Sequence, residues 1–279
     1  MLSYRHSFHA GNQADVLKHT VLIFCLDYLA QKTKPFLYAD THAGAGFYRL
    51  DGGIQNREWP RGIGKVKGGG PMIARYLEVL GEKPEGYTGS PLIAAALLRP
   101  DDRGCCFELH PADFAALRDR LAGDRRFQVR KEDGLEGLKS LLPPTPRRGL
   151  IFIDPSYELK EDYPRLIGAL EDSLRRFAGG LYLIWYPLLT GPKGLDYGGD
   201  LMGLYGERRC RAELRFGLPE VRDPEDQKAH LYGCGLVLFN PPWTLRAALG
   251  ETLPVLAETL GGDWEMNWEE NVNKIIGKN

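Results

Sequence analysis

The sequence predicts an α/β protein built on a doubly wound, mostly parallel sheet. Short runs with strand character alternate with stretches of helical periodicity along most of the 279 residues, which is typical of a sheet covered by helices. The run LIFID at 150–154 is continuously apolar, as expected for a strand buried on both faces. A Gly-rich turn follows the first predicted strand, an arrangement found where ligands bind at the carboxyl ends of parallel strands.

The first elements are a long helix and a short strand. Residues 13–31 carry apolar side chains at near-helical spacing, and Asn12 suits the cap position before them. The strand FLYAD at 36–40 lies between Pro35 and the turn THAGAG. The same patterns predict strands at 103–109, 127–131 and 181–186, helices at 111–122 and 161–178, and two late strands in RAELRFG and CGLVLFN.

One stretch breaks the alternation. Residues 47–88 contain many glycines and the helical segment PMIARYLEVLG, and residues 91–98 add a second helix. We therefore predict an inserted, mostly helical subdomain at 47–100, with residues 1–46 and 101–279 forming the main domain.

Composition narrows the class of protein. An apolar fraction of 43% with 26% charged residues is ordinary for a globular chain and too apolar for a disordered one. No apolar run approaches the roughly 20 residues that a bilayer requires, and no signal peptide is expected. The five cysteines contain no C-x-x-C pair, so we expect a reduced, cytoplasmic chain without a disulfide framework or a zinc knuckle.

The formal net charge is only -1, from 36 basic and 37 acidic side chains, which excludes a uniformly cationic surface. The total is close to zero because the charges of basic and acidic regions of the chain cancel. Residues 57–75 and 118–148 each hold four more basic than acidic side chains, whereas residues 249–279 hold four more acidic ones. The two basic regions disfavour a small molecule as the substrate and favour nucleic acid.

The turn DTHAGAG at 40–46 is the first candidate for ligand binding. Glycine lets the backbone approach a ligand closely and offer N–H groups to an anion, although any tight turn after a strand also favours glycine. The fingerprint G-x-G-x-x-G is absent, which disfavours a nicotinamide enzyme.

Carboxylates follow the next two predicted strands. Glu108 ends the second strand, where an acidic residue commonly accepts hydrogen bonds from ribose hydroxyls; a solvated strand-end carboxylate is the plain alternative. Glu132, Asp133 and Gly134 follow the third strand. A carboxylate there can receive the exocyclic amine of an adenine, while Asp-Gly is also common in turns for backbone reasons.

The most specific local signal is Asp154-Pro155-Ser156-Tyr157, directly after the apolar fourth strand. An amine conjugated to an aromatic base is a poor nucleophile because its lone pair is delocalised into the ring. Hydrogen-bond acceptors push such an amine toward tetrahedral geometry, and the Asp154 carboxylate and the Pro155 carbonyl can serve in that way. Tyr157 can stack on an extruded base. The alternative is a buried Asp that caps the next turn.

A similar motif, Asn-Pro-Pro-Trp at 240–243, follows the last predicted strand. The cofactor loop lies far upstream, and in an unpermuted fold the catalytic loop follows the fourth strand. We therefore assign residues 240–243 a structural or base-flanking role.

The N-terminal segment is rich in imidazole and aromatic groups, and imidazole is a common metal ligand. However, His6, His9, His19 and His42 lack a recognised ligand spacing or a paired set of Cys or carboxylate ligands. No metal is expected.

Together these segments resemble the RlmJ family, whose members are 23S ribosomal RNA adenine-N6 methyltransferases that use S-adenosylmethionine. The resemblance rests on MLSYRHSFHAGNQADVLKH, FLYADTHAGAG, YTGSPLIA, DPSYE and GLVLFNPPW, in the expected order along nearly the whole chain. It implies a Rossmann-like class I methyltransferase fold with a small inserted helical subdomain, and direct in-line methyl transfer. It also implies a cytoplasmic protein, which we expect to be a monomer, whose partner is 23S ribosomal RNA that is free or partly assembled.

The resemblance implies roles for individual residues. Asp154 is the implied catalytic residue, flanked by Pro155 and Tyr157, and Tyr4 would help to place the target adenosine. The family turn usually reads D-P-P-Y, and Ser156 replaces the second proline here, so the turn loses one fixed φ angle while the chemistry stays available. The implied cofactor-binding residues are Lys18, His19, His42, Ser90, Glu108, Asp133, Gly134 and Asp154.

Three other functions fit parts of the pattern. An adenine-N6 DNA methyltransferase would share the D-P-x-Y turn, but it normally carries a sizeable target-recognition domain that is not visible here. The presence of Asp154 and Tyr157 disfavours a non-catalytic RNA-binding protein, and the basic regions disfavour a small-molecule N-methyltransferase. For an RNA methyltransferase we expect modest RNA affinity with a shallow salt dependence, because few phosphates would be neutralised.

Overall fold

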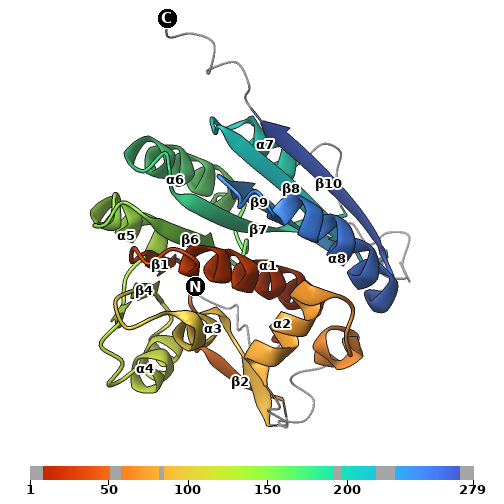
Figure 1. The fold of residues 1–279 in the computed structure, drawn as a ribbon, viewed down its shortest axis with the longest axis horizontal. Coiled ribbons are helices and arrows are strands. Elements are labelled where there is room, and N and C mark those ends of the chain that lie inside the picture. Colours follow the sequence, from red (N-terminus) through yellow and green to blue (C-terminus); the bar gives the residue numbers. More distant parts are fainter. Residues whose placement is uncertain (1–8, 51–57, 82–84, 191–195, 218–229, 271–279) are drawn as a thin grey trace, which may run out of the picture.

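An eight-stranded sheet forms the centre of the fold (Figure 1). The computed structural model describes residues 9–50, 58–81, 85–190, 196–217 and 230–270. In spatial order the strands are β10 (Asp263–Glu270), β8 (Arg208–Arg215), β9 (Leu231–Phe239), β7 (Leu181–Leu189), β6 (Gly149–Ile153), β1 (Leu37–Asp40), β4 (Arg103–Phe107) and β5 (Phe127–Arg130).

Parallel pairing dominates one part of this sheet. β5, β4, β1, β6 and β7 are mutually parallel, whereas β9, β8 and β10 continue the sheet with antiparallel pairs. The predicted α/β class with a mostly parallel sheet is therefore confirmed. The chain leaves β1 toward β4 and β5 and later returns to the other side of β1 with β6 and β7. The strand order thus reverses between β1 and β6, and such a switch point opens a crevice at the carboxyl ends of the strands.

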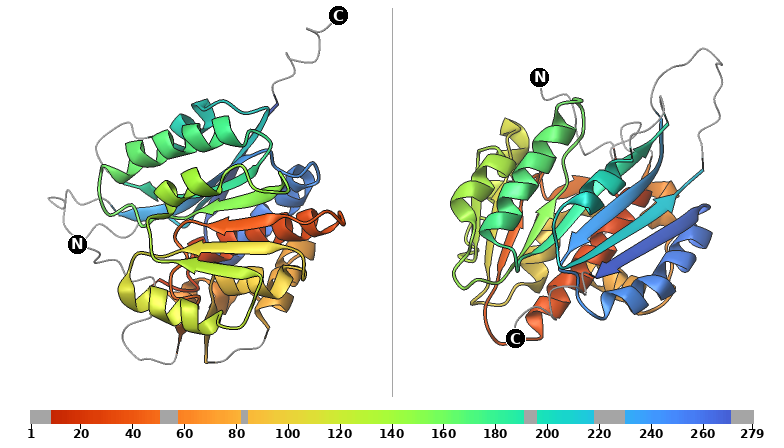
Figure 2. Two further views of the ribbon diagram at one scale, coloured as in Figure 1. Left: turned by 90° about the vertical axis from the view of Figure 1, so that its left-hand side faces the viewer. Right: turned by 90° about the horizontal axis from the view of Figure 1, so that it is seen from above.

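Helices cover both faces of the sheet, as Figure 2 shows. Buried apolar side chains form two clusters, one on each face. β6 supplies both, because Leu150 and Phe152 belong to one cluster and Ile151 and Ile153 to the other, as strand alternation requires. One face carries α1 (Gln13–Ala30), α2 (Pro71–Leu80), α3 (Ser90–Leu97), α4 (Pro111–Arg120) and α8 (Leu245–Leu260), and the other carries α5 (Gly134–Leu141), α6 (Asp162–Arg176) and α7 (Tyr197–Gly203).

The predicted insertion at 47–100 contains strands as well as helices. β2 (Phe47–Arg49) and β3 (Gly86–Thr88) form a two-stranded antiparallel sheet, and the short turns η3 (Trp59–Arg61) and η4 (Ile63–Lys65) precede α2. α2 packs on α1 and α8, while α3 lies against β1 and β4. The segment therefore covers one face of the central sheet as well as extending from it.

Most predicted elements appear with small shifts in their ends, and several further elements were not predicted. The predicted strand 103–109 ends at Phe107, so Glu108 lies in the following loop, and the strand predicted at 181–186 continues to Leu189. α5, α7, α8, β10 and the two strands of the small sheet, β2 and β3, were not predicted. β10 nevertheless has a period of two, since Trp264, Met266 and Trp268 pack toward the core. None of the described helices combines the length and apolarity needed to cross a bilayer.

Candidate active site

A cavity of about 300 Å³ lies at the carboxyl ends of the parallel strands, beside the switch point between β1 and β6. α1 and the start of α3 complete its wall. Tyr4 lies outside the described residues. The predicted site residues that line the cavity are Lys18, His19, His42, Ser90, Glu108, Asp133, Gly134, Asp154, Pro155 and Tyr157.

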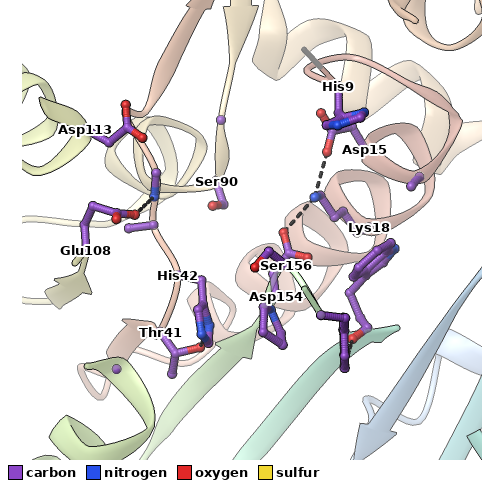
Figure 3. A pocket seen from close by; sticks show the side chains of 18 of the residues that line it. His9, Asp15, Lys18, Thr41, His42, Ser90, Glu108, Asp113, Asp154 and Ser156 are labelled. Carbon is purple, nitrogen blue, oxygen red and sulfur yellow. Dashed lines mark hydrogen bonds and ion pairs between the residues drawn. The ribbon is translucent and has the colours of Figure 1, made fainter. Parts of the chain in front are cut away.

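Asp154 and Lys18 form an ion pair in the cavity wall (Figure 3). Lys18 Nζ lies 2.6 Å from Asp154 Oδ2 and 2.7 Å from Asp15 Oδ1. The Lys18 side chain is only 5% exposed and sits with its ammonium 5.5 Å from the centre of the Trp185 ring. Two carboxylates thus share one buried ammonium, which compensates the cost of burying these charges and orients Asp154.

Asp40 is a buried carboxylate beneath the cavity floor. It is 0% exposed, and its oxygens accept hydrogen bonds from Tyr38 Oη at 2.6 Å, Ser90 Oγ at 2.7 Å and the His42 amide at 3.3 Å. Burial raises the pKa of Asp40 to about 6, although the Tyr38 and Ser90 hydrogen bonds oppose this rise. Asp40 therefore ties the turn after β1 to the first residue of α3.

His42 is a neutral imidazole at physiological pH. Its Nδ1 lies 2.8 Å from Thr41 Oγ1. Burial lowers the pKa of His42 to about 4, against the opposing effect of the Asp154 and Asp133 carboxylates. The ring can therefore offer one donor and one acceptor but no charge.

Glu108 is oriented by the backbone. Its Oε2 accepts from the Gly44 amide at 2.8 Å and its Oε1 from the His110 amide at 2.6 Å. Burial raises the pKa of Glu108, while these two hydrogen bonds oppose the rise. The Gly-rich turn after β1 and the loop after β4 are thus joined through one carboxylate that faces the cavity (Figure 3).

Asp133 and Gly134 begin α5 at the cavity wall. Asp133 caps the helix by accepting the Glu136 amide at 3.1 Å, and its Oδ2 lies 2.5 Å from Arg165. Burial opposes ionisation of Asp133, but the Arg165 and Glu136 hydrogen bonds outweigh it and hold its pKa below the usual range. A Cβ at Gly134 would collide with the carbonyl oxygen of Thr41, so only glycine allows this close approach of α5 to the turn after β1.

Tyr157 has a left-handed backbone, with φ 52°, which costs about 1 kcal/mol for a residue with a side chain. Its hydroxyl donates to the Trp185 carbonyl at 2.7 Å, and its ring packs against those of Tyr163 and Tyr197. These contacts hold the strained turn, and a face of the residue still lines the cavity. Stacking of Tyr157 on a base stays a prediction.

His19 contacts β3, the second strand of the small sheet. Its Nδ1 lies 2.6 Å from Tyr87 Oη, and the two rings are stacked with centroids 5.6 Å apart. Tyr87 Oη lies 3.0 Å from Tyr76 Oη on α2. The orientation of His19 in the cavity wall therefore depends on the segment between β1 and α3.

A second contact joins that segment to the start of α1. Both carboxylate oxygens of Glu58 are engaged, by Asn12 Nδ2 at 2.9 Å and by His9 Nδ1 at 3.0 Å. Asn12 caps α1 by accepting the Asp15 amide at 2.9 Å, and the Ile63 amide donates to the Gly11 carbonyl at 2.8 Å. We call these contacts the Glu58 clamp. Asp15, whose amide donates to Asn12, pairs with Lys18, and Lys18 pairs with Asp154, so the clamp is connected to the candidate catalytic residue.

The motif at 240–243 lies at the opposite edge of the sheet. β9 runs antiparallel to β7, so its end is far from the carboxyl ends of the parallel strands. Asn240 has φ 53°, and its side-chain amide donates to the carbonyls of Ala178 at 2.7 Å and Gly180 at 2.6 Å. The structure thus supports the structural role and places the motif away from the cavity.

Some residues that organise this site have no recognisable signal in the sequence. Asp15, Glu58 and Trp185 are separated from Asp154 along the chain, and only folding brings them into one network. Asp40 was visible within the turn DTHAGAG, yet its burial could be known only from the packing of α3. Among the residues that the structure describes, no group of three or more His, Cys, Asp or Glu is placed to hold a metal ion.

Comparison with known proteins identifies the family. The family model described as ribosomal RNA large subunit methyltransferase D, RlmJ, matches residues 33–270. The chain is 42% identical to ribosomal RNA large subunit methyltransferase J of Haemophilus influenzae, covering 96% of this chain and 99% of that protein. It is 40% identical to the protein of the same name from Escherichia coli, covering 93% and 94%.

A solved structure has the same fold. A crystal structure of a protein from Legionella pneumophila superposes with a TM-score of 0.82 at 32% identity, covering 95% of this chain and 99% of that one. Sequence and fold therefore agree over almost the full chain, and the protein belongs to the RlmJ family of ribosomal RNA large subunit methyltransferases.

Proposed function

We propose that this protein transfers a methyl group from S-adenosylmethionine to the exocyclic N6 of one adenosine in 23S ribosomal RNA. The observation that carries the proposal is the position of Asp154, which follows β6 at the switch point and faces a cavity large enough for a ligand. Relatives named ribosomal RNA large subunit methyltransferase J support ribosomal RNA as the substrate. We further propose a cytoplasmic protein that acts without a metal on free or partly assembled RNA.

The residues of the cavity fit S-adenosylmethionine, which supplies an electrophilic methyl group when it is bound. Glu108, oriented by two backbone amides, is suited to accept ribose hydroxyls. Asp133 and Gly134 are assigned to the adenine. Lys18, His19, His42 and Ser90 are assigned to the remainder of the cofactor, and the carboxylates Glu108 and Asp133 favour a ligand that carries a sulfonium cation.

The proposed chemistry needs acceptors for the amine hydrogens rather than a strong base. Asp154 Oδ2 is engaged by Lys18, so Oδ1 and the Pro155 carbonyl are the acceptors assigned to N6 of the target base. They localise the nitrogen lone pair, and the proton is lost after transfer because the methylated ammonium is acidic. Positioning supplies most of the rate enhancement. Tyr157 is assigned to stacking and Tyr4 to placing the adenosine.

The Asp154→Ala variant tests this assignment. We expect methyl transfer to be abolished while the calorimetric affinity for S-adenosylmethionine stays nearly unchanged, since Lys18 keeps its ion pair with Asp15. Glu171→Ala, which removes an exposed carboxylate on α6 outside the cavity, is the matched control. An equal loss of turnover and cofactor affinity would instead make Asp154 a residue of the binding pocket.

The substrate is tested by mapping N6-methyladenosine in 23S RNA from cells with and without this protein. One modified position should disappear in its absence, and purified protein should methylate unmodified 23S RNA but not duplex DNA. Methylation of DNA alone would favour a DNA methyltransferase. Cofactor binding without turnover on any RNA would favour a non-catalytic RNA-binding protein.

A further inference from the structure

The amino ends of the parallel strands form the edge of the sheet that lies opposite the candidate active site. Because β5, β4, β1, β6 and β7 are parallel, the segments that precede them meet at one edge. The register aligns Leu37 with both Arg103 and Gly149, and Leu150 with Leu181. We name this the basic edge, and it consists of residues 31–36, 99–103, 124–126, 147–148 and 175–176.

The two edges carry opposite charge. The segments of the basic edge contain ten Lys and Arg side chains against three Asp. The segments that follow β1, β4, β5 and β6 at the cavity, residues 41–46, 108–110, 131–133 and 154–161, contain two basic side chains against six acidic ones. The acidic excess suits a cationic cofactor, but it does not attract a polyanionic substrate.

Part of the basic edge is structural. Arg148 donates to the Lys34 carbonyl at 2.5 Å, and Arg99 donates to the Lys32 carbonyl at 2.7 Å and pairs with Asp102. Burial, followed by the neighbouring Arg99 guanidinium, lowers the pKa of Arg148. Cations are therefore packed against one another here, and backbone carbonyls of the segment that follows α1 bind two of them.

Other cations on the same edge have no such structural role. Lys32, Arg125 and Arg147 are exposed, and within the described ranges none of the three forms an ion pair with a carboxylate. Arg147 makes one long contact of 3.4 Å to the Arg176 carbonyl. Like charges gathered along one edge repel unless a counter-charge is bound, so the arrangement is suited to an external polyanion.

The shape and composition of the basic edge favour RNA over a membrane surface. Five adjacent strands span about 20 Å at the usual spacing, which is wide enough for several phosphates. None of the large apolar side chains exposed in the described structure belongs to the five segments of the basic edge. Trp243 lies at the same edge of the sheet, and the Arg208 guanidinium lies 3.9 Å from the centre of its ring. Stable attachment to a bilayer uses inserted apolar side chains in addition to charge.

We propose that the basic edge binds the sugar-phosphate backbone of a second segment of the RNA whose adenosine enters the cavity at the opposite edge. This inference rests on the proposed function. The cavity then selects the base, and the basic edge supplies part of the affinity without reading sequence. Such a division suits a substrate with several neighbouring helices, because one short strand does not reach both edges.

The experiment uses the full chain and an unmodified 23S RNA transcript. Lys32→Gln combined with Arg147→Gln removes two exposed cations of the basic edge. Arg118→Gln combined with Lys139→Gln is the matched control, because it removes the same charge from two exposed cations that already pair with neighbouring carboxylates. RNA affinity is measured across a salt series, with KM for the transcript and calorimetric affinity for S-adenosylmethionine alongside.

We expect the basic-edge variant to bind RNA about tenfold more weakly near 0.1 M salt, with a salt slope smaller by about 1.5. KM for the transcript should rise in parallel, while cofactor affinity and thermal midpoint stay at wild-type values. Equal RNA affinity and salt slope in the two double variants would overturn the proposal. So would a basic-edge variant that keeps its RNA affinity and loses only its binding to anionic lipid vesicles. A wild-type protein that leaves the transcript unmethylated would overturn the proposed function instead, and the binding data would still report on the edge.

Discussion

Buried carboxylates organise the residues around the cavity. Asp15 receives the Gly11 amide at 2.7 Å and pairs with Lys18, and Asp40 receives the Ser90 hydroxyl. Neither is assigned to a ligand, yet each fixes a side chain that is. Because a buried carboxylate is costly unless its hydrogen bonds are satisfied, these residues hold their neighbours in one geometry.

The raised pKa of Asp40 predicts a specific pH dependence of stability. Its pKa is about 6 in the folded protein and about 3.9 in an unfolded chain. Between about pH 4 and pH 6 the folded protein therefore binds a proton that the unfolded chain does not. The stabilising effect of that proton is present below about pH 4 and is lost as pH rises through 6. Asp40→Asn does not titrate, so its stability relative to wild type should increase by up to about 3 kcal/mol from pH 4 to 7.

Denaturant unfolding of both proteins across this pH range provides the measurement. The comparison must be between variants, because His42 acts with the opposite sign: its pKa is lowered to about 4, so its contribution is lost as pH falls below about 6.5. Asp101→Asn, at an exposed position, should run parallel to wild type. A parallel profile for Asp40→Asn would contradict the raised pKa.

At the scale of elements, the site depends on how closely helices approach the turn after β1. The start of α5 touches the Thr41 backbone at Gly134. The resemblance to the RlmJ family assigns Gly134 to the adenine, and the structure adds a packing reason for glycine. The Asp133 cap and the Gly134 contact together place α5 against the cavity.

Gly134→Ala should separate α5 from the turn after β1. We expect a loss of about 2 kcal/mol in stability, as for other overpacked sites, and at least tenfold weaker binding of S-adenosylmethionine by calorimetry. Gly168→Ala is the control, because a Cβ there meets nothing within 4 Å and alanine favours a helix interior. Wild-type cofactor affinity in Gly134→Ala would show that the turn can move without cost to the site.

The Glu58 clamp links the segment between β1 and α3 to the first turn of α1. Glu58→Ala removes both side-chain contacts to Asn12 and His9, and we expect a loss of about 1 to 2 kcal/mol. Amide hydrogen exchange at residues 9–16 should accelerate, since the Asn12 cap loses its support. Glu85→Ala, which truncates an exposed side chain, should leave that exchange unchanged. Unchanged exchange in both variants would mean that the clamp does not order this turn.

At the scale of the whole molecule, the net charge of -1 conceals a separation of charge. The acidic excess of the C-terminal segment is partly neutralised within the sheet, because β10 pairs with β8 and Arg209 lies 2.7 Å from Glu269. The cations of the basic region at 118–148 differ in their surroundings. Lys139 and Arg118 pair with carboxylates, whereas Arg147 is exposed at the basic edge. Few cations are therefore available to phosphates.

This distribution predicts a shallow salt dependence for the wild-type protein. We expect log affinity for 23S RNA to fall with log salt at a slope of about -2 to -4, which corresponds to a few neutralised phosphates. Titrations between 0.05 and 0.3 M salt provide the measurement, with unrelated structured RNA as the comparison for specificity. A slope of about -6 or steeper, equivalent to eight or more contacts, would contradict this picture.

How much the sequence reveals differs between the elements. The apolar run of β6 and the Asn12 cap of α1 are local patterns, and both were predicted correctly. α8 was not predicted because Gly250 and Pro254 interrupt the helical pattern of its sequence, although tertiary packing supports the helix. The acidic residues of β10 are unusual in a strand and obscure its type in the sequence, although Trp264, Met266 and Trp268 alternate as strand residues do.

The sequence by itself determined the fold class, the order of the candidate site residues and the resemblance to the RlmJ family, because these depend on local periodicity and short motifs. The order of the two similar motifs along the chain already favoured DPSY, and the tertiary structure supplied the physical reason. DPSY follows a parallel strand, whereas NPPW follows the antiparallel β9 and lies at the other edge. Strand direction, the Asp15–Lys18–Asp154 network and the basic edge all arise from pairing between distant segments, which no local pattern encodes.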